Sequence, residues 1–274
     1  MKLAVAVAAE NAPPSAFVVW RGFDESIPKA AELGYHGIEL ALKTADEVKP
    51  DRLARRLEQY GLQVSAITTG QVFACLGLHF THTEQGVREK AFGVFRELIH
   101  LAKDFGGIVN VGRARGFVGA GQSRQRTEAL FIDMARRLCD EAAPLGVSIV
   151  LEPVNRYEIN FINSLDEAAG VLARVERDNI GLMPDVFHMN IEDARIGEAL
   201  ARHGRWVRYV HLADSNRLAP GRGHLNFDEV FAGLRRAGFD GWAAVEILPD
   251  PDADTAARQA AEKILPMIEE YNRG

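Results

Sequence analysis

Four side chains that could bind a metal ion stand at or near the ends of apolar runs in the C-terminal half of the chain. They are Glu152 in "VSIVLE", Asp185 in "IGLMPD", His211 in "VRYVHL" and Glu246 in "AAVEIL". A buried carboxylate without a partner is costly, so each charge must be exposed, paired or bound to a metal. Each residue taken alone is more simply explained as a loop ion pair or a hydrogen-bonded core histidine.

The chemistry changes if the four side chains meet. Three carboxylates gathered around one imidazole would repel one another, and a divalent cation removes that repulsion. Oxygen-rich ligands with a single nitrogen suit Mn²⁺, Mg²⁺ or Co²⁺, of which Mn²⁺ is the expected ion. Zn²⁺ remains an alternative, although it usually recruits more nitrogen or sulfur. The residue types therefore predict a metal centre if the fold brings these positions together.

The elements that would position these residues alternate regularly along the chain. Eight short apolar runs, rich in β-branched residues, predict strands buried on both faces at 3–7, 36–40, 64–68, 107–112, 147–152, 180–185, 207–212 and 243–248. The segments between them have helical spacing of apolar residues, as at 52–60 and 128–142. Ser164 is typical of a helix start, and a glycine follows the last turn of several predicted helices.

This alternation predicts one (β/α)8 TIM barrel domain over residues 1–274. A doubly wound open sheet is the alternative, but it would more often carry a glycine-rich phosphate loop after its first strand. The segment "AVAAENAPPSAF" is not such a loop. In a barrel, consecutive strands are neighbours, so the four side chains would converge at the C-terminal mouth, where barrel enzymes hold their active sites.

Composition describes an ordinary globular protein, with 47% hydrophobic and 26% charged residues and a formal net charge of −6. The negative charge disfavours nucleic acid as a partner. No apolar run approaches the length of a membrane helix, so no membrane partner is expected. The N-terminus reads as a buried strand rather than a signal peptide. Cys75 and Cys139 lie among apolar residues and are expected to be reduced core residues of a cytoplasmic protein.

At these motifs the sequence resembles the metal-dependent ketose 3-epimerases of the D-tagatose 3-epimerase type, within the xylose isomerase-like barrel superfamily. The matching stretches are "LEPVNRYEINFINS" (151–164), "DVFHMNIED" (185–193), "HLADSNRLAPGRGHLNFDEVF" (211–231) and "VEILP" (245–249). Two further stretches, "TTGQVFACLGLHFTH" (68–82) and "VGRARG" (111–116), resemble the 5-keto-L-gluconate epimerases. Members of the superfamily often form dimers or tetramers, so a homo-oligomer is an open expectation here.

The resemblance implies a role for each motif residue. It implies that Glu152, Asp185, His211 and Glu246 bind the metal and that Glu152 and Glu246 also form the acid/base pair. It further implies that the residues holding the substrate include Glu158, His188 and Arg217, with Gln71 expected to join them from the stretch 68–82. The competing interpretations are ion pairs of Arg217 with Asp214 and of Glu158 with Arg156.

The chemistry that these parts imply is inversion of the carbon next to a ketone through an enediolate. A base on one face of the planar intermediate and an acid on the other would be needed. Arg113 and Arg115 are expected at the mouth after the fourth predicted strand, where a bidentate arginine would suit a substrate carboxylate. This favours a keto-hexonate such as 5-keto-L-gluconate or tagaturonate over a neutral ketose. Trp20, Phe73 and Phe187 could line the site or belong to the core.

Three other functions fit parts of the pattern. An aldose–ketose isomerase, such as hydroxypyruvate isomerase, would use the same metal and carboxylates but would move the carbonyl. An apurinic endonuclease would need additional histidines after the third and fourth predicted strands, where the sequence reads "AITTG" and "VNVGR". A sugar-sensing barrel would bind its ligand without turnover.

Overall fold

The strands form a nearly closed ring of parallel neighbours in the computed structural model, which describes residues 1–13 and 16–274. The strands are β1 Lys2–Ala8, β2 Trp20–Arg21, β3 Gly37–Ala41, β4 Gln63–Thr68, β5 Ile108–Val111, β6 Ser148–Leu151, β7 Ile180–Leu182, β8 Tyr209–Leu212 and β9 Trp242–Val245. Their order is β7-β6-β5-β4-β3-β1-β9-β8, and the short β2 pairs with β1 outside this path. Two parallel bridges, Leu182 with Val207 and Asp185 with His211, join the β7 and β8 sides. The predicted (β/α)8 barrel is confirmed, and an open sheet does not fit these bridges.

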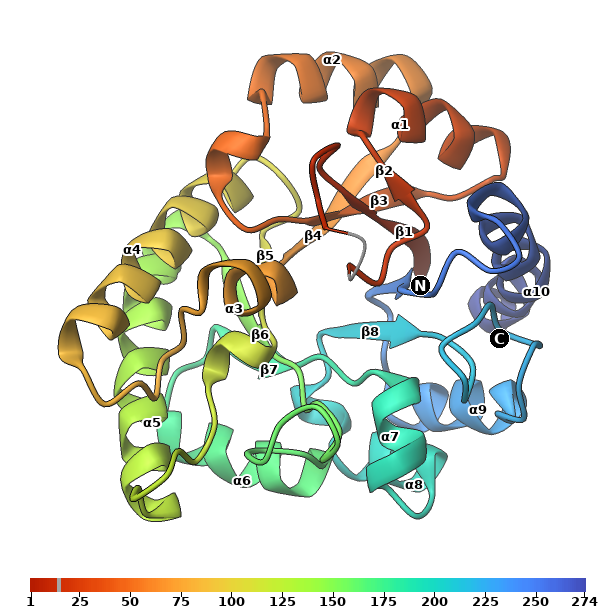
Figure 1. Cartoon of the computed structure of the whole chain (residues 1–274). Helices are drawn as coiled ribbons and strands as arrows, with labels where there is room; N and C mark the ends of the chain where they lie inside the picture. Colours follow the sequence, from red (N-terminus) through yellow and green to blue (C-terminus); the bar gives the residue numbers. More distant parts are fainter. Residues whose placement is uncertain (14–15) are drawn as a thin grey trace.

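Helices surround the ring, which Figure 1 shows viewed along its axis. They are α1 Phe23–Glu32, α2 Pro50–Tyr60, α3 Gly70–Leu76, α4 Gln85–Ala102, α5 Arg124–Ala142, α6 Leu165–Val175, α7 Val186–Glu192, α8 Ile196–Arg202, α9 Phe227–Arg236 and α10 Ala253–Arg273, with 3-10 turns at Ala45–Glu47, Arg113–Arg115, Ala143–Leu145 and Gly204–Trp206. Local sequence sets their ends. Ser164 caps α6 by accepting from the Glu167 N–H at 3.3 Å. Gly61 ends α2 in the left-handed conformation, as expected.

Alternation along the strands fills the barrel interior and separates it from the core under the helices. In β1, Leu3, Val5 and Val7 belong to the large apolar core, whereas Ala4, Ala6 and Ala8 belong to two small groups apart from it. Because successive strand side chains point to opposite faces, the alanines line the interior. Small side chains there leave room for the polar groups described below.

The same alternation places the predicted metal ligands in one layer. Val150, Met183, Tyr209 and Ala244 form a buried interior group. Each stands two residues before a metal-capable side chain, and those side chains are Glu152, Asp185, His211 and Glu246 in the same order. A step of two residues keeps the same face and moves toward the strand's C-terminal end. An apolar interior layer therefore supports a polar layer at the C-terminal mouth.

Some details differ from the sequence-based expectations. Asp185 was expected to end a strand, but β7 stops at Leu182 and Asp185 caps the following helix. Cys139 is buried as expected, whereas Cys75 is exposed, so its placement in the core was wrong. The reason is that α3 buries Gln71 and Val72 in its first turn while its last turn faces solvent, with Leu76 39% exposed.

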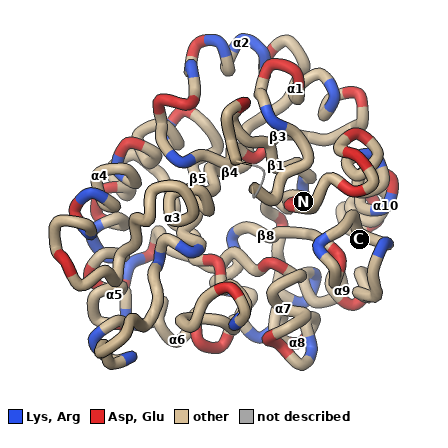
Figure 2. Tube along the Cα trace, viewed as in Figure 1, with Lys and Arg blue, Asp and Glu red and all other residues tan. Residues whose placement is uncertain are grey.

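The outer surface carries charges of both signs. Lysine and arginine alternate with aspartate and glutamate along the outer helices (Figure 2). Among residues 1–13 and 16–274, no helix is long and apolar enough to cross a membrane.

Candidate metal centre and substrate pocket

The four predicted ligands meet at the mouth of the barrel. One ligand atom from each of Glu152, Asp185, His211 and Glu246 lies within 4.8 Å of the others, and this is the sole group of its kind in the described part of the chain. The Nδ1 atom of His211 lies 3.5 Å from a Glu152 oxygen and 3.7 Å from a Glu246 oxygen. The four side chains therefore surround one small volume.

Two atoms of this cluster have no hydrogen-bond partner although they are buried: Oδ2 of Asp185 and Nδ1 of His211. Buried polar atoms in folded proteins are nearly always satisfied, so such orphans call for an explanation. A divalent cation among the four side chains would satisfy both atoms and neutralise the carboxylates. The donor set of three carboxylates and one imidazole thus fits a metal of the Mn²⁺ or Mg²⁺ type.

In two of the carboxylates, those of Asp185 and Glu152, a neighbouring group holds one oxygen so that the other faces the cluster. Oδ1 of Asp185 accepts from the Phe187 N–H at 2.9 Å, which is the N-cap bond of α7. Oε2 of Glu152 accepts from the amide of Asn110 at 3.0 Å. Both carboxylates are therefore oriented before a cation arrives.

His211 is oriented by Glu39, a residue that was not predicted from the sequence to belong to the site. Glu39 lies in β3, is fully buried, and its Oε2 lies 2.8 Å from Nε2 of His211. Its other oxygen accepts from the Thr68 hydroxyl at 3.0 Å. A carboxylate on the far nitrogen of a histidine directs the near nitrogen toward a metal. The available signal was a glutamate inside the apolar run "HGIEL", which needs a buried partner.

The environment shifts the pKa values of the cluster in opposite directions. Burial raises the pKa of Asp185 to about 7 and also raises the pKa of Glu246. Burial disfavours the charged form of Glu152 too, but the positive charge of the nearby His211 and the hydrogen bond from Asn110 outweigh it and lower the pKa of Glu152 to about 2. Burial opposes protonation of His211, yet the charges of Glu39 and Glu246 raise its pKa well above the ordinary value. In the metal-free protein, positive charge on His211 thus partly replaces a cation.

Arg217 reaches into the site from the loop between β8 and α9. Its guanidinium donates to Glu246 at 2.5 Å and to Glu158 at 3.2 Å, and it lies 3.8 Å from Asp185. The predicted alternative, an ion pair with Asp214, does not occur: Asp214 instead accepts backbone N–H groups of its own loop.

The backbone of Arg217 is strained, because its φ of 61° is unusual for a residue with a side chain. Two contacts hold it there: its N–H donates to the Asp214 carbonyl at 2.9 Å, and its carbonyl accepts from the Leu248 N–H at 2.8 Å. The guanidinium also lies over the ring of Phe17 at 3.9 Å and near that of Phe187 at 4.7 Å. Strain of this kind concentrates at functional sites.

His188 and Glu158 border the same space. His188 lies on α7 and is 2% exposed, with Nε2 at 3.6 Å from Asp185 and 3.9 Å from Glu152. These separations exceed hydrogen-bond length, which leaves Nε2 room for another partner. Burial and the charge of Arg217 lower the pKa of His188 well below its ordinary value, so the ring is neutral. The predicted pair of Glu158 with Arg156 is absent, because Arg156 binds Glu192.

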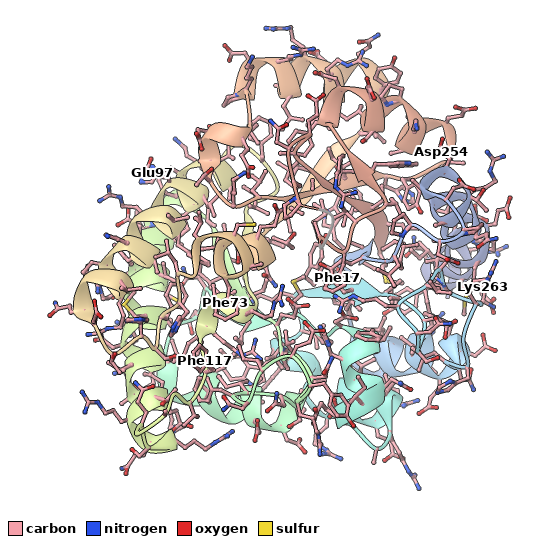
Figure 3. The ribbon with its side chains drawn as sticks, in the orientation of Figure 1. Phe17, Phe73, Glu97, Phe117, Asp254 and Lys263 are labelled. Atoms are coloured by element: carbon pink, nitrogen blue, oxygen red, sulfur yellow. The ribbon has the colours of Figure 1, made fainter. Side chains whose placement is uncertain are left out.

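A cavity beside the cluster is lined by residues that include Phe17, Gln71, Arg113 and Glu246. Gln71 donates to the Ala41 carbonyl at 2.9 Å, and its buried Oε1 has no partner. Arg113 lies 3.8 Å from Glu158, with its guanidinium 5.9 Å from the ring of Phe73. In Figure 3, Phe17 lies near the middle of the ring, whereas Glu97 lies on the outer helices. Phe17 could not be predicted as a site residue, because an isolated phenylalanine in a loop carries no distinguishing pattern.

Arg115, which was expected at the mouth, is placed elsewhere, and Trp20, for which both a site wall and the core were open, lies in the core. Arg115 is fully buried and donates to the carbonyls of Gly112, Glu152, Phe161 and Ile162, so the expectation that it could meet a substrate carboxylate was wrong. The physical reason is that each of these loop carbonyls needs a donor once it is buried. The indole of Trp20 donates to Asp254 at 2.7 Å, and the ring belongs to the large apolar core.

Residues 27–267 match the family model of the xylose isomerase-like TIM barrel. The chain belongs to this family. An L-ribulose 3-epimerase of Methylomonas sp. (strain DH-1) is 30% identical over 226 residues, which cover 80% of this chain and 76% of that protein. A 3-dehydro-D-guloside 4-epimerase of Escherichia coli (strain K12) is 34% identical over 114 residues, covering 42% and 44% respectively.

Solved structures agree with the fold. The crystal structure of a D-allulose 3-epimerase from Methylomonas sp. in complex with D-allulose has a TM-score of 0.81 at 25% identity and covers 97% of this chain and 98% of that one. The predicted enzyme class, an isomerase of the sugar epimerase type, is confirmed by these relatives. Their names differ in the sugar and in the carbon that is inverted, so they do not decide the substrate.

Proposed function

We propose that this protein is a divalent-metal-dependent epimerase that inverts the carbon next to the ketone of a ketose or keto-hexonate. The observation that carries the proposal is the meeting of four side chains from separate strand ends within 4.8 Å, with a buried unpartnered atom on Asp185 and on His211. The proposed ligands are Glu152, Asp185, His211 and Glu246, and Mn²⁺ is the favoured ion. When bound, such an ion supplies Lewis-acid stabilisation of the negative charge that develops on the substrate oxygens.

The proposed reaction exchanges one proton for another on opposite faces of the substrate. One of Glu152 and Glu246 takes the proton from the carbon next to the ketone, and the carbonyl becomes an enediolate. The other, in its protonated form, returns a proton to the opposite face, which restores the ketone and leaves the carbon inverted. Glu152 follows β6 and Glu246 follows β9, so the two carboxylates enter the site from well-separated parts of the ring.

Three further residues are proposed to bind the first oxygens of the substrate. His188 presents Nε2 to the space between Asp185 and Glu152. Arg217 brings positive charge to the side of Glu246, where an enediolate would be negative. Glu158 accepts from Arg217 and keeps an oxygen available for a substrate hydroxyl.

The substrate is proposed to be a keto-hexonate of the 5-keto-L-gluconate or tagaturonate type. Its carboxylate would bind Arg113, which contributes a positive charge to the cavity and has only a long contact, 3.8 Å, with Glu158. The unpartnered Oε1 of Gln71 would accept from a hydroxyl of the same end of the sugar. Replacing Arg113 by alanine should raise KM for an acidic sugar by about tenfold or more and leave a neutral ketose nearly unchanged. Equal losses for both substrates would remove the proposed carboxylate contact.

Solvent deuterium exchange tests the reaction itself. The Mn²⁺-loaded protein is incubated in D₂O with a panel of neutral ketoses and keto-hexonates, and the label is located by NMR. Label on the hydroxyl-bearing carbon next to an unmoved ketone, with both epimers present, supports the proposal. A carbonyl that moves to the neighbouring carbon would instead identify an aldose–ketose isomerase such as hydroxypyruvate isomerase, and binding without exchange would identify a sugar-binding barrel.

The remaining expectations from the sequence stay predictions. They are a cytoplasmic location, a homo-dimer or tetramer and a single domain over residues 1–274. Neither nucleic acid nor a membrane is an expected partner. The apurinic endonuclease alternative needs extra histidine ligands after the third and fourth predicted strands, and among residues 1–13 and 16–274 the group of metal-capable side chains includes no histidine other than His211.

A further inference from the structure

The side chain of Asn155 has both of its ends fixed by hydrogen bonds. Asn155 lies in the loop after β6 and is 2% exposed. Its Oδ1 accepts from the Tyr157 N–H at 3.0 Å. Its Nδ2 lies 2.8 Å from Nδ1 of His188 and 3.4 Å from a carboxylate oxygen of Glu158.

These neighbours admit one orientation of the amide. If the amide were turned over, its NH₂ group would face the Tyr157 N–H, a donor against a donor. Its carbonyl oxygen would then face the carboxylate of Glu158, an acceptor against an acceptor. The observed orientation satisfies all three contacts. Nδ2 therefore donates to His188.

We propose that Asn155 is a positioning residue that fixes His188 in the tautomer with its proton on Nε2. A nitrogen that accepts a hydrogen bond carries no proton, so Nδ1 of a neutral ring must leave the proton on Nε2. Nε2 is the atom that faces the space between Asp185 and Glu152, at 3.6 Å and 3.9 Å. Asn155 thereby makes His188 a hydrogen-bond donor toward the substrate oxygen, without itself touching the substrate.

Further hydrogen bonds within the loop support the position of Asn155. The Asn163 amide donates to the carbonyls of Val154 and Ile159, at 2.7 Å each. The carbonyl of Asn155 accepts from two N–H groups of the following turn, those of Glu158 and Ile159. Pre-organisation of this kind matters, because a donor that must first reorient loses part of its effect on the transition state.

The inference rests on the proposed function, because only a substrate oxygen gives the Nε2 proton its role, but its test does not need turnover. Histidines are labelled with ¹⁵N, and the His188 signals are assigned by their loss in His188→Gln. The metal-free protein is used, and the shifts of Nδ1 and Nε2 report which nitrogen carries the proton. We expect Nε2 to be protonated and Nδ1 to be free. A proton on Nδ1 in the unaltered protein overturns the inference without any variant.

Asn155→Asp provides the second arm. The new carboxylate cannot donate to Nδ1, so the proton should move to Nδ1 or both nitrogens should become protonated. With metal at saturation, kcat should fall about 10²-fold, the loss typical of one transition-state donor, while KM changes little. Asn163→Ser is the matched control, because it loosens the same loop but does not contact His188; its tautomer should stay as in the unaltered protein.

The outcomes separate this inference from the proposed function. If His188 keeps its Nε2 proton in Asn155→Asp, or if Asn163→Ser shifts the tautomer equally, Asn155 has only a structural role. Failure of the deuterium-exchange experiment described above would instead remove the epimerase and would leave the tautomer result in place.

Discussion

Removing the charge of Glu39 should weaken metal binding although Glu39 does not belong to the four proposed ligands. The change is Glu39→Gln, which keeps the shape of a fully buried side chain 2.8 Å from Nε2 of His211. If the new amide donates to Nε2, the proton of His211 must move to Nδ1, the nitrogen that faces the other ligands. If it accepts instead, the negative charge that makes His211 a better ligand is still lost. Both arrangements lower the affinity.

The expected loss is about 10- to 100-fold in metal affinity, the usual effect of removing such a supporting carboxylate, or about 1.4–2.7 kcal/mol. Isothermal titration of the metal-free protein with Mn²⁺ measures it without a substrate. Thr68→Val is the matched control, because it removes the 3.0 Å bond to Glu39 but leaves the His211 contact in place. If Glu39→Gln binds Mn²⁺ as tightly as the unaltered protein, the role assigned to Glu39 is refuted. If Thr68→Val loses as much metal affinity as Glu39→Gln, the effect of Glu39 comes from packing and not from its charge.

Three further predictions concern the same site. Glu152→Gln and Glu246→Gln, each at saturating metal, should lower kcat for epimerisation by about 10²-fold or more. Each variant should still exchange a proton with solvent, but with only one of the two epimers. Inversion at the unaltered rate in either variant would contradict the acid/base pair. Metal affinity should rise with pH, steeply below pH 7 and less steeply above it. Binding must displace the proton of Asp185, whose pKa burial raises to about 7, and a proton of His211, whose pKa nearby carboxylates raise well above its ordinary value; calorimetry in buffers of different ionisation enthalpy counts the released protons, and a flat profile would contradict it. Arg115→Met should lower the free energy of unfolding in urea by about 3 kcal/mol or more, because four buried carbonyls lose a donor; a change near zero would mean that water replaces the guanidinium.

The barrel could be predicted from local signals because those signals repeat. Each predicted strand is a short apolar run, and helix ends carry a serine cap or a left-handed glycine, as at Ser164 and Gly61. Strand ends were less accurate: "IGLMPD" reads as one run, but Pro184 has no N–H for a ladder and β7 ends at Leu182. The two-residue β2 is too short to leave a pattern.

The part of the site that could be predicted is the part that follows from the two-residue periodicity of the strands. Glu152, Asp185, His211 and Glu246 meet because each follows a buried interior residue by two positions at the C-terminal mouth of the barrel. The contacts that cross between strands could not be derived in this way. The bond between Glu39 and His211 joins residues 172 positions apart, and local spacing carries no information about it.

Arg115 shows that a motif does not determine where each of its residues lies. Arg113 and Arg115 look equivalent in "VGRARG", yet they lie on a 3-10 turn that directs one toward the cavity and buries the other among backbone carbonyls. Their fates depend on the turn conformation and on the carbonyls of the loop after β6, which the sequence motif does not specify.

The central claim is that one cation joins the four strand-end side chains. Anomalous diffraction from crystals grown with Mn²⁺ measures this directly. The account predicts a single anomalous peak, with one ligand atom from each of Glu152, Asp185, His211 and Glu246 at about 2.0–2.2 Å from it. This is the range for oxygen and imidazole ligands of small divalent ions. A peak elsewhere, or no peak among these four side chains at saturating Mn²⁺, would contradict it.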